Sequence, residues 1–272
     1  MDRTLLSAIL ALLLGLSQAL SPMEELDSNH RPFDVQSEDS AALDITSRIL
    51  EANKGISHML MEGDVAVSKT RNAMKCWGNS NHCRWRKSSS GLVEVPYTIS
   101  DYFYDHEKTT FENAMESFNT KTCVRFVPWT GQTDYISIEN KEGCWSYLGR
   151  FGGKQMVSLN VYGCVYHGII QHELLHALGF YHEHTRSDRD QYVKINWENI
   201  QSANANNFRK KDTNNLNTPY DYSSVMHYGR TAFTTEYGKD TITPVPDPSV
   251  RIGQRQEMSD IDIQRINQFY EC

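Results

Sequence analysis

The stretch HELLHALGFYH, residues 172–182, decides how the rest of the chain is interpreted. On a helix, His172 and His176 stand four residues apart, so both imidazoles project from one face and can hold one metal ion. Glu173 is rotated about 100° from His172 by the helical period, so it can sit beside that metal without binding it. Gly179 permits a sharp turn out of the helix, which can bring His182 round as a third ligand.

This ligand set indicates a catalytic site. Three imidazoles leave at least one coordination position for water, as in catalytic rather than structural zinc sites. Bound zinc lowers the pKa of that water to about 7, and Glu173 can act as the general base. A bare His-Glu-x-x-His also arises by chance, but the helical context, the glycine and the third histidine make the motif specific. We therefore predict one zinc ion per chain, bound by His172, His176 and His182.

Composition bounds the class of protein. The chain has 272 residues, of which 39% are hydrophobic and 22% charged, as expected of a globular protein. Its formal net charge is −7, and it has no basic run of the kind that follows a phosphate backbone. Nucleic-acid binding is therefore not expected.

The N-terminus resembles an export signal. A short apolar run over residues 5–16 is followed by the small residues Ser17 and Ala19. The run is short for a membrane span, and no second run of comparable length follows. A membrane anchor and a buried helix are the alternatives. We predict a signal peptide over residues 1–19, an extracellular protein that leaves the cell by secretion, with secretory granules as one route, and no membrane attachment.

Residues 20–71 differ from the rest of the chain, because they are acidic and contain no cysteine and no tryptophan. A basic tripeptide, Lys69-Thr70-Arg71, ends the segment. A linker or tail is one interpretation. We favour a pro-segment that an activating trypsin-like protease removes between Arg71 and Asn72, which leaves residues 72–272 as the catalytic domain.

The cysteines agree with export. An even number of cysteines behind a signal peptide predicts a disulfide framework, although sequence alone leaves the pairing open. No Cys-x-x-Cys pair is present, so a cysteine-bound structural zinc is not expected. The six cysteines are Cys76, Cys83, Cys123, Cys144, Cys164 and Cys272.

Hydrophobic periodicity predicts an α+β fold. Alternation favours a strand over residues 92–99, and further strands are expected over 124–127, 135–139 and 156–160. Helices are expected over 106–120 and 167–178, and a last helix after Ser259, which can cap it. Residues 184–257 are polar and rich in loops.

A second motif, SSVMHY at residues 223–228, completes a resemblance. The long zinc motif followed by a methionine turn is the metzincin pattern. Together the two motifs resemble the astacin family of zinc metalloendopeptidases over essentially all of residues 72–272. The resemblance implies a two-lobed domain, with a mixed sheet and the active-site helix in the upper lobe and an irregular lower lobe. It also implies that Met226 lies beneath the metal, and that Tyr228 is an additional zinc ligand that swings away to stabilise the oxyanion.

The same resemblance implies residues that keep the precursor latent and residues that act when it is activated. Astacin precursors carry an aromatic-x-Gly-Asp motif whose aspartate takes the position of the zinc-bound water. Asp64 matches that aspartate, although Met61 stands where the family usually has Phe. Glu183 is similar to the astacin glutamate that meets the newly formed N-terminus, here Asn72.

The family's disulfides imply the pairs Cys123–Cys272 and Cys144–Cys164, which leaves Cys76 to pair with Cys83. This additional pair resembles the fish hatching enzymes (choriolysins), which digest egg-envelope protein. That subgroup commonly has Asn where Leu175 stands here. We expect a monomer with egg-envelope protein as substrate.

Two alternatives to a hatching enzyme remain open. The chain could be an astacin of leukocytes or gut that acts in defence, digestion or tissue remodelling. It could also be a catalytically inactive, zinc-binding interaction module. The presence of Glu173 and Tyr228 argues against the second alternative.

Overall fold

The computed structural model describes residues 44–67, 83–254 and 256–272. All of them belong to one unit of the chain, residues 36–272. The predicted signal peptide, the cleavage point between Arg71 and Asn72, and Cys76 lie outside the described residues. Among the helices that are described, none has the length and apolar character needed to cross a membrane.

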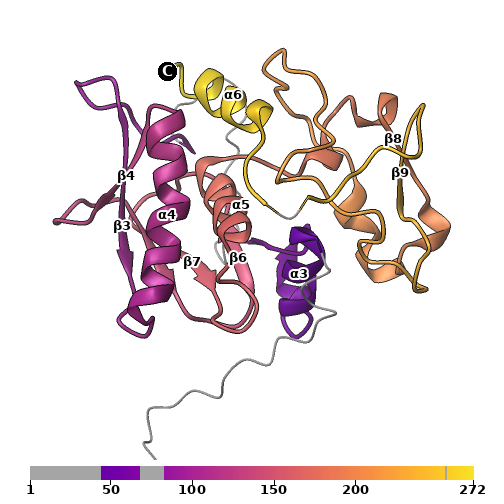
Figure 1. Ribbon diagram of the computed structural model, residues 1–272, viewed down its shortest axis with the longest axis horizontal. Coiled ribbons are helices and arrows are strands. Elements are labelled where there is room, and N and C mark those ends of the chain that lie inside the picture. Colours follow the sequence, from indigo (N-terminus) through magenta and orange to yellow (C-terminus); the bar gives the residue numbers. More distant parts are fainter. Residues whose placement is uncertain (1–43, 68–82, 255) are drawn as a thin grey trace, which may run out of the picture. The chain divides into compact units, whose positions relative to one another are not determined.

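A seven-stranded mixed sheet forms the first half of the fold, in the strand order β1-β2-β6-β7-β5-β3-β4. Figure 1 shows its strands β3, β4, β6 and β7. Strands β3, β4, β5 and β7 run parallel, and β6 runs antiparallel to β7. Most of their aliphatic residues are buried, as expected for parallel strands that are covered by helices. The bounds are β3 Val93–Ile99, β4 Val124–Pro128, β5 Tyr135–Glu139, β6 Cys144–Tyr147 and β7 Lys154–Leu159.

Two helices pack with this sheet. Helix α4, Asp105–Lys121, begins with a capping contact in which the Glu107 carboxylate accepts from the Tyr104 N–H at 2.8 Å. Its inner face is apolar, and it lies against β4 and against helix α5, His167–Leu178. Nearly every residue of α5 is buried, because α5 also contacts β6 and β7. The helix that carries the zinc motif is therefore held from several sides.

The chain after residue 182 is mostly irregular. It contains short 3-10 turns and a two-stranded antiparallel sheet of β8, Val193–Ile195, and β9, Ile242–Pro244. This part has a hydrophobic core of its own, separate from the core around the large sheet. That core contains Val193, Ile195, Ile200, Phe208, Tyr220, Tyr228, Ala232 and Ile242. The predicted α+β fold, with a sheet-bearing part and an irregular part, is confirmed.

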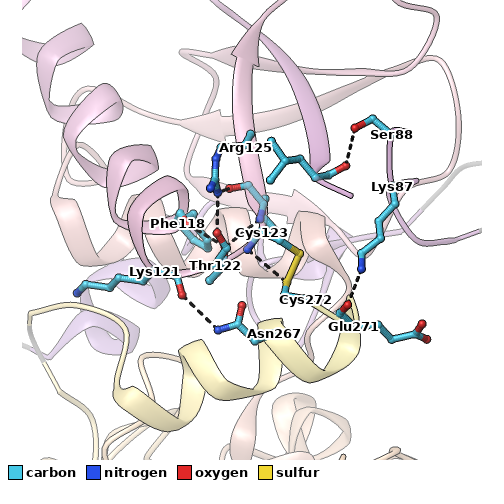
Figure 2. The surroundings of a disulfide bond; sticks show 12 residues. Lys87, Ser88, Phe118, Lys121, Thr122, Cys123, Arg125, Asn267, Glu271 and Cys272 are labelled. Carbon is cyan, nitrogen blue, oxygen red and sulfur yellow. Dashed lines mark hydrogen bonds between the residues drawn. A yellow bond between two sulfur atoms is a disulfide. The ribbon is translucent and has the colours of Figure 1, made fainter. Parts of the chain in front are cut away.

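The last helix, α6, spans Asp260–Phe269. Ser259 caps it by accepting from the Asp262 N–H at 2.9 Å, and the Asp262 carboxylate accepts from the Ser259 N–H at 3.0 Å in return. Two residues beyond the adjacent Tyr270, Cys272 forms a disulfide with Cys123 (Figure 2). Helix α6 is therefore fixed at both ends.

The predicted pro-segment is an ordered part of the same unit over residues 44–67. Helix α3, Ile45–Ala52, places Ile45 and Ile49 in the core around the large sheet. A turn, η1 at Ser57–Met59, leads to the short strands β1, Leu60–Met61, and β2, Val65–Ala66. Strand β2 pairs in parallel with β6 and antiparallel with β1, so the β1–β2 hairpin extends the large sheet beyond β6.

The helices predicted over 106–120 and 167–178 and the four predicted strands correspond to α4, α5, β3, β4, β5 and β7. Sequence periodicity missed α3, β1, β2, β6, β8 and β9. These elements have ten residues or fewer, and β2, β8 and β9 pair with strands far away in the sequence. Their formation is decided by tertiary pairing rather than by local pattern.

Candidate metal centre

Three imidazoles converge at the C-terminal part of α5. His172 and His176 project from one face of the helix, and His182 follows it after a turn. The turn begins at Gly179, which has a left-handed backbone with φ of 105°. A side chain would be strained in that conformation, so glycine is required there. The His172 and His182 Nε2 atoms lie 3.2 Å apart, and all three side chains are buried.

The outer nitrogen of each ring contacts an acceptor. The Nδ1 atoms of His172 and His176 lie 2.9 Å and 2.8 Å from the backbone oxygens of Val225 and Phe180. The His182 Nδ1 lies 2.9 Å from a carboxylate oxygen of Glu62. Carbonyl and carboxylate oxygens only accept, so each Nδ1 carries the proton and each neutral ring presents the Nε2 lone pair inward.

The Asp64 carboxylate lies among the three inward nitrogens. Its Oδ2 is 3.1 Å from the His172 Nε2 and 3.2 Å from the His182 Nε2, and its Oδ1 is 3.3 Å from the His176 Nε2. One ligand atom from each of the four residues lies within 4.8 Å of the others. Burial lowers the pKa of His172 to about 4. Burial also lowers the pKa of His182, but without a metal the Asp64 and Glu62 carboxylates outweigh this effect and raise it to about 9. These carboxylates thus favour a positive charge at the His182 ring, which a bound cation would supply in place of the Nε2 proton.

These residues fit a divalent cation. Buried carboxylates around three neutral nitrogen donors favour positive charge at the point where those donors meet. The His176 Nε2 and the Asp64 Oδ1 are buried without a hydrogen bond to any group of the described protein, as expected of atoms that coordinate a metal. Imidazole nitrogens with a carboxylate oxygen suit zinc.

The segment that carries Asp64 is held tightly. Gly63 has a φ of 81°, and a Cβ on it would lie 2.3 Å from the Leu50 Cδ2, so the chain can approach this closely only with glycine. Its carbonyl accepts from the Asn53 Nδ2 at 2.8 Å. The Tyr228 hydroxyl donates to the Glu62 carbonyl.

Glu173 and Tyr228 are both buried beside the cluster. Neither carboxylate oxygen of Glu173 has a hydrogen-bond partner in the described protein. Burial and the neighbouring charge of Asp64 raise the pKa of Glu173 well above its ordinary value. The Tyr228 ring packs against His182, with ring centroids 4.7 Å apart. Burial, together with the charges of Asp64 and Glu62, raises the pKa of its hydroxyl.

Met226 lies in a tight turn of residues 224–226. Its N–H donates to the Ser224 Oγ at 3.0 Å, and its carbonyl accepts from the Glu183 N–H at 3.0 Å. Its side chain is buried in the core around the large sheet. The turn thereby connects to the segment just after His182.

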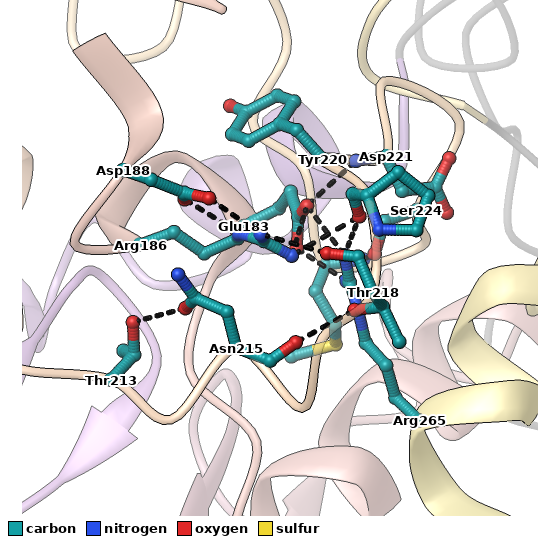
Figure 3. A network of polar contacts seen from close by, with 12 residues as sticks. Glu183, Arg186, Asp188, Thr213, Asn215, Thr218, Tyr220, Asp221, Ser224 and Arg265 are labelled. Carbon is teal, nitrogen blue, oxygen red and sulfur yellow. Dashed lines mark hydrogen bonds and ion pairs between the residues drawn. The ribbon is translucent and has the colours of Figure 1, made fainter. Parts of the chain in front are cut away.

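Glu183 lies in a buried polar network (Figure 3). Its carboxylate accepts from Arg265 at 2.5 Å and 2.8 Å and from the Asp221 N–H at 2.7 Å. Burial raises its pKa, against the opposing charges of Arg265 and Arg186. Asn72, its predicted partner, lies outside the described residues.

Disulfides join Cys123 to Cys272 and Cys144 to Cys164, which are two of the pairs implied by the family resemblance. Cys83 is also disulfide-bonded, whereas Cys76 lies outside the described residues.

Comparison with known proteins agrees with this geometry. The family model described as Astacin, a peptidase family, matches residues 78–271. The chain belongs to the astacin family. It is 55% identical over 264 residues to High choriolytic enzyme 1 of Oryzias latipes, covering 97% of this chain and 96% of that protein. It is 53% identical over 267 residues to the Low choriolytic enzyme of the same fish, covering 98% and 97%.

A solved structure extends the likeness to the fold. The structure of High choriolytic enzyme 1, a hatching enzyme zinc-protease from Oryzias latipes, matches with a TM-score of 0.70 and 62% sequence identity. The match covers 74% of this chain and 100% of that chain. This astacin is therefore a zinc metalloendopeptidase with the metzincin fold, closely related to the hatching enzymes.

Sequence reasoning missed several groups around the metal centre. Glu62 contacts His182 and also forms an ion pair with Lys211 at 3.0 Å. The backbone oxygens of Val225 and Phe180 orient the other two ligands. Glu62 adjoins the Gly63-Asp64 motif, but nothing in the sequence points it at a histidine 120 residues later.

Proposed function

We propose that this astacin is a secreted endopeptidase, made as a zymogen, whose substrate is egg-envelope protein. His172, His176 and His182 hold the zinc, which when bound supplies an acidified water and polarises the scissile carbonyl. Glu173 takes the proton of the attacking water and passes it to the leaving amine. Its carboxylate lies on the same helix as His172 and His176 and has no hydrogen-bond partner among the described residues, so it is free to take a proton between these two transfers.

Tyr228 has a second role in this proposal. In the precursor its hydroxyl donates to the Glu62 carbonyl. Removal of the pro-segment frees that hydroxyl, and the same donor can then stabilise the oxyanion of the substrate. A phenol is protonated at neutral pH, and the protonated form is the one that donates.

The observation that carries the zymogen proposal is the position of Asp64 among the three histidine nitrogens. A carboxylate there excludes the water that catalysis needs. Two further contacts of the pro-segment also block the site: Glu62 contacts His182, and β2 covers the edge of β6. Once the pro-segment is removed, the β6 edge can bind an extended peptide by strand addition.

Activation proceeds by cleavage between Arg71 and Asn72 by a trypsin-like protease, which separates the pro-segment, 20–71, from the enzyme, 72–272. The signal peptide, 1–19, is removed earlier, during export. The new N-terminal ammonium then docks near Glu183. Support comes from the buried Glu183 carboxylate, which lies directly after His182 in the chain and is held beside the methionine turn. An ammonium that reaches Glu183 would add to the ion pair between Glu183 and Arg265.

The substrate assignment rests on relatives. High and Low choriolytic enzymes of Oryzias latipes match nearly the whole chain at more than half identity. Export is supported by the disulfides, which persist in oxidising compartments. We propose that the enzyme acts as a monomer.

The test is hydrolysis of casein and of purified egg-envelope protein by the precursor, before and after limited trypsin treatment, with and without a zinc chelator. We expect activity only after trypsin, its loss with the chelator, and its return with added zinc. N-terminal sequencing of the product should begin at Asn72. Activity on casein without any on egg envelope would overturn the hatching role and leave the peptidase intact.

A further inference from the structure

One side chain of the C-terminal helix α6, that of Asp262, contacts the turn that carries Met226. Asp262, in its first turn, is buried, although an aspartate at the start of a helix usually faces water. Its Oδ1 accepts from the Ser224 hydroxyl at 2.6 Å, and its Oδ2 accepts from the Val225 N–H at 2.9 Å. Both partners belong to the turn that carries Met226.

That turn orients a metal ligand. The carbonyl of Val225 lies 2.9 Å from the His172 Nδ1. Asp262 accepts from the N–H of Val225, and the C=O of Val225 orients the imidazole of His172. A continuous line of hydrogen bonds therefore runs from α6 through Val225 to His172, across residues that are far apart in the sequence.

Further contacts hold helix α6 in position on the C-terminal side of Asp262. Arg265, one turn further along, donates to Glu183 and, through its Nε, to the Thr218 hydroxyl at 2.9 Å (Figure 3). At the other end, Asn267 donates to the Lys121 carbonyl at 3.2 Å beside the Cys123–Cys272 disulfide (Figure 2). These contacts leave the helix little freedom to shift along or rotate about its axis.

Asp262 also closes the capping box with Ser259, so a purely structural role must be separated from a role at the metal. The cap requires only one acceptor for the Ser259 N–H. The contacts to Ser224 and Val225 are not needed for the cap, and they place a buried carboxylate against the methionine turn. Burying a carboxylate costs free energy that these extra hydrogen bonds offset, so they indicate that the turn itself is held in place.

We propose that Asp262 is a positioning residue of the zinc centre: through Ser224 and Val225 it fixes the backbone carbonyl that orients His172. Partners of this kind set the tautomer and direction of a ligating histidine, and their loss typically weakens metal binding about 10- to 100-fold. Asp262 touches neither substrate nor reacting atoms.

The test measures zinc affinity of the full-length precursor by competition with a chelating dye, so it depends on no substrate and no activation. Asp262→Ala should raise the zinc dissociation constant about 10- to 100-fold. Asp262→Asn should recover most of the affinity, because its amide oxygen still accepts from Val225 while its amide N–H can donate to Ser224. Asp260→Ala, at an exposed aspartate of the same helical turn, is the matched control and should bind zinc like the wild type.

A folded Asp262→Ala protein that binds zinc as tightly as the Asp260→Ala control would overturn the proposal. If Asp262→Ala does not fold, zinc affinity is measured for Ser224→Ala instead. This variant removes the hydroxyl that donates to Asp262 and leaves the Ser259 cap intact. Weaker zinc binding by Ser224→Ala supports the proposal, and unchanged binding overturns it. Peptidase activity enters neither outcome, so a failure here is distinct from a failure of the proposed function.

Discussion

At the scale of single residues, the histidines and Glu173 differ in their hydrogen bonding. The three histidine Nε2 atoms point at one place because their Nδ1 atoms are each held by an acceptor. Glu173 has no such partner among the described residues and lies on the same helix one residue after His172. The difference in hydrogen bonding matches the difference in role that we propose for them.

The first prediction concerns Glu173. Glu173→Gln keeps the size of the side chain but removes the base, so kcat of the activated enzyme should fall about 100- to 10,000-fold. The zinc content should stay at the wild-type value, because the ligands and their partners are unchanged. Activity assays and metal analysis of the same sample check both points. An active Glu173→Gln enzyme would remove Glu173 as the base.

The sequence could predict that the three histidines lie together, because the information is local. His172 and His176 are related by one helical turn, and the left-handed position at Gly179 is a short-range demand of the turn toward His182. The partners Glu62, Val225 and Asp262 were not predictable, because each meets its target across a large separation in sequence. No periodicity encodes such pairs, so only the folded arrangement reveals them.

At the scale of elements, the loop after the metal centre is braced by an ion pair. The Arg186 guanidinium donates to both carboxylate oxygens of Asp188, at 2.9 Å each. These hydrogen bonds lower the pKa of Asp188, against a smaller opposing effect of partial burial. The folded state therefore binds the proton of Asp188 less tightly than the unfolded chain does, and the pair stabilises the fold only while Asp188 is ionised.

The second prediction follows from the lowered pKa of Asp188 in the folded state. The contribution of Asp188 should be present above its unfolded pKa of about 4 and be lost as the pH falls through the lowered folded value. Asp188→Asn should reduce the free energy of unfolding by about 1 kcal/mol at neutral pH, since the pair is partly exposed. The difference from the wild type in urea unfolding should begin to shrink as the pH falls below about 4 and vanish below the lowered folded pKa. A difference that is independent of pH would contradict the ionic origin.

The β1–β2 hairpin is the element that carries the proposed switch. Asp64→Ala removes only the carboxylate from among the three histidines. The β2–β6 pairing and the Asn53 contact to Gly63 remain. We therefore predict a precursor with measurable activity before cleavage, below that of the trypsin-activated enzyme.

The control for Asp64→Ala is Glu51→Ala, which removes an exposed carboxylate of the same segment and should leave the precursor latent. Both precursors are assayed on casein without trypsin, with gel analysis to exclude cleavage. A fully latent Asp64→Ala precursor would mean that the Glu62 contact with His182 and coverage of the β6 edge maintain latency without Asp64.

At the scale of the whole molecule, the proposed pro-segment belongs to the core of the precursor. Ile45 and Ile49 of α3 are buried in the same hydrophobic cluster as α4, α5 and the large sheet. Composition marks residues 20–71 as a separate acidic segment, and it gives no sign of this packing. The apolar stripe of α3 is too short for sequence periodicity to distinguish it from a loop.

This packing leads to the last prediction: a peptide of residues 44–67 should inhibit the activated enzyme when added separately. The peptide would recover burial of Ile45 and Ile49 in addition to the contacts of Asp64 with the histidines. Ile49→Ala in the peptide removes apolar contacts worth about 2 kcal/mol or more, so it should raise the inhibition constant at least about tenfold. Glu51→Ala, at an exposed position of the same helix, should inhibit like the parent peptide. If Ile49→Ala inhibits as well as the parent, binding depends on the Asp64 hairpin alone, and α3 serves only the stability of the intact precursor.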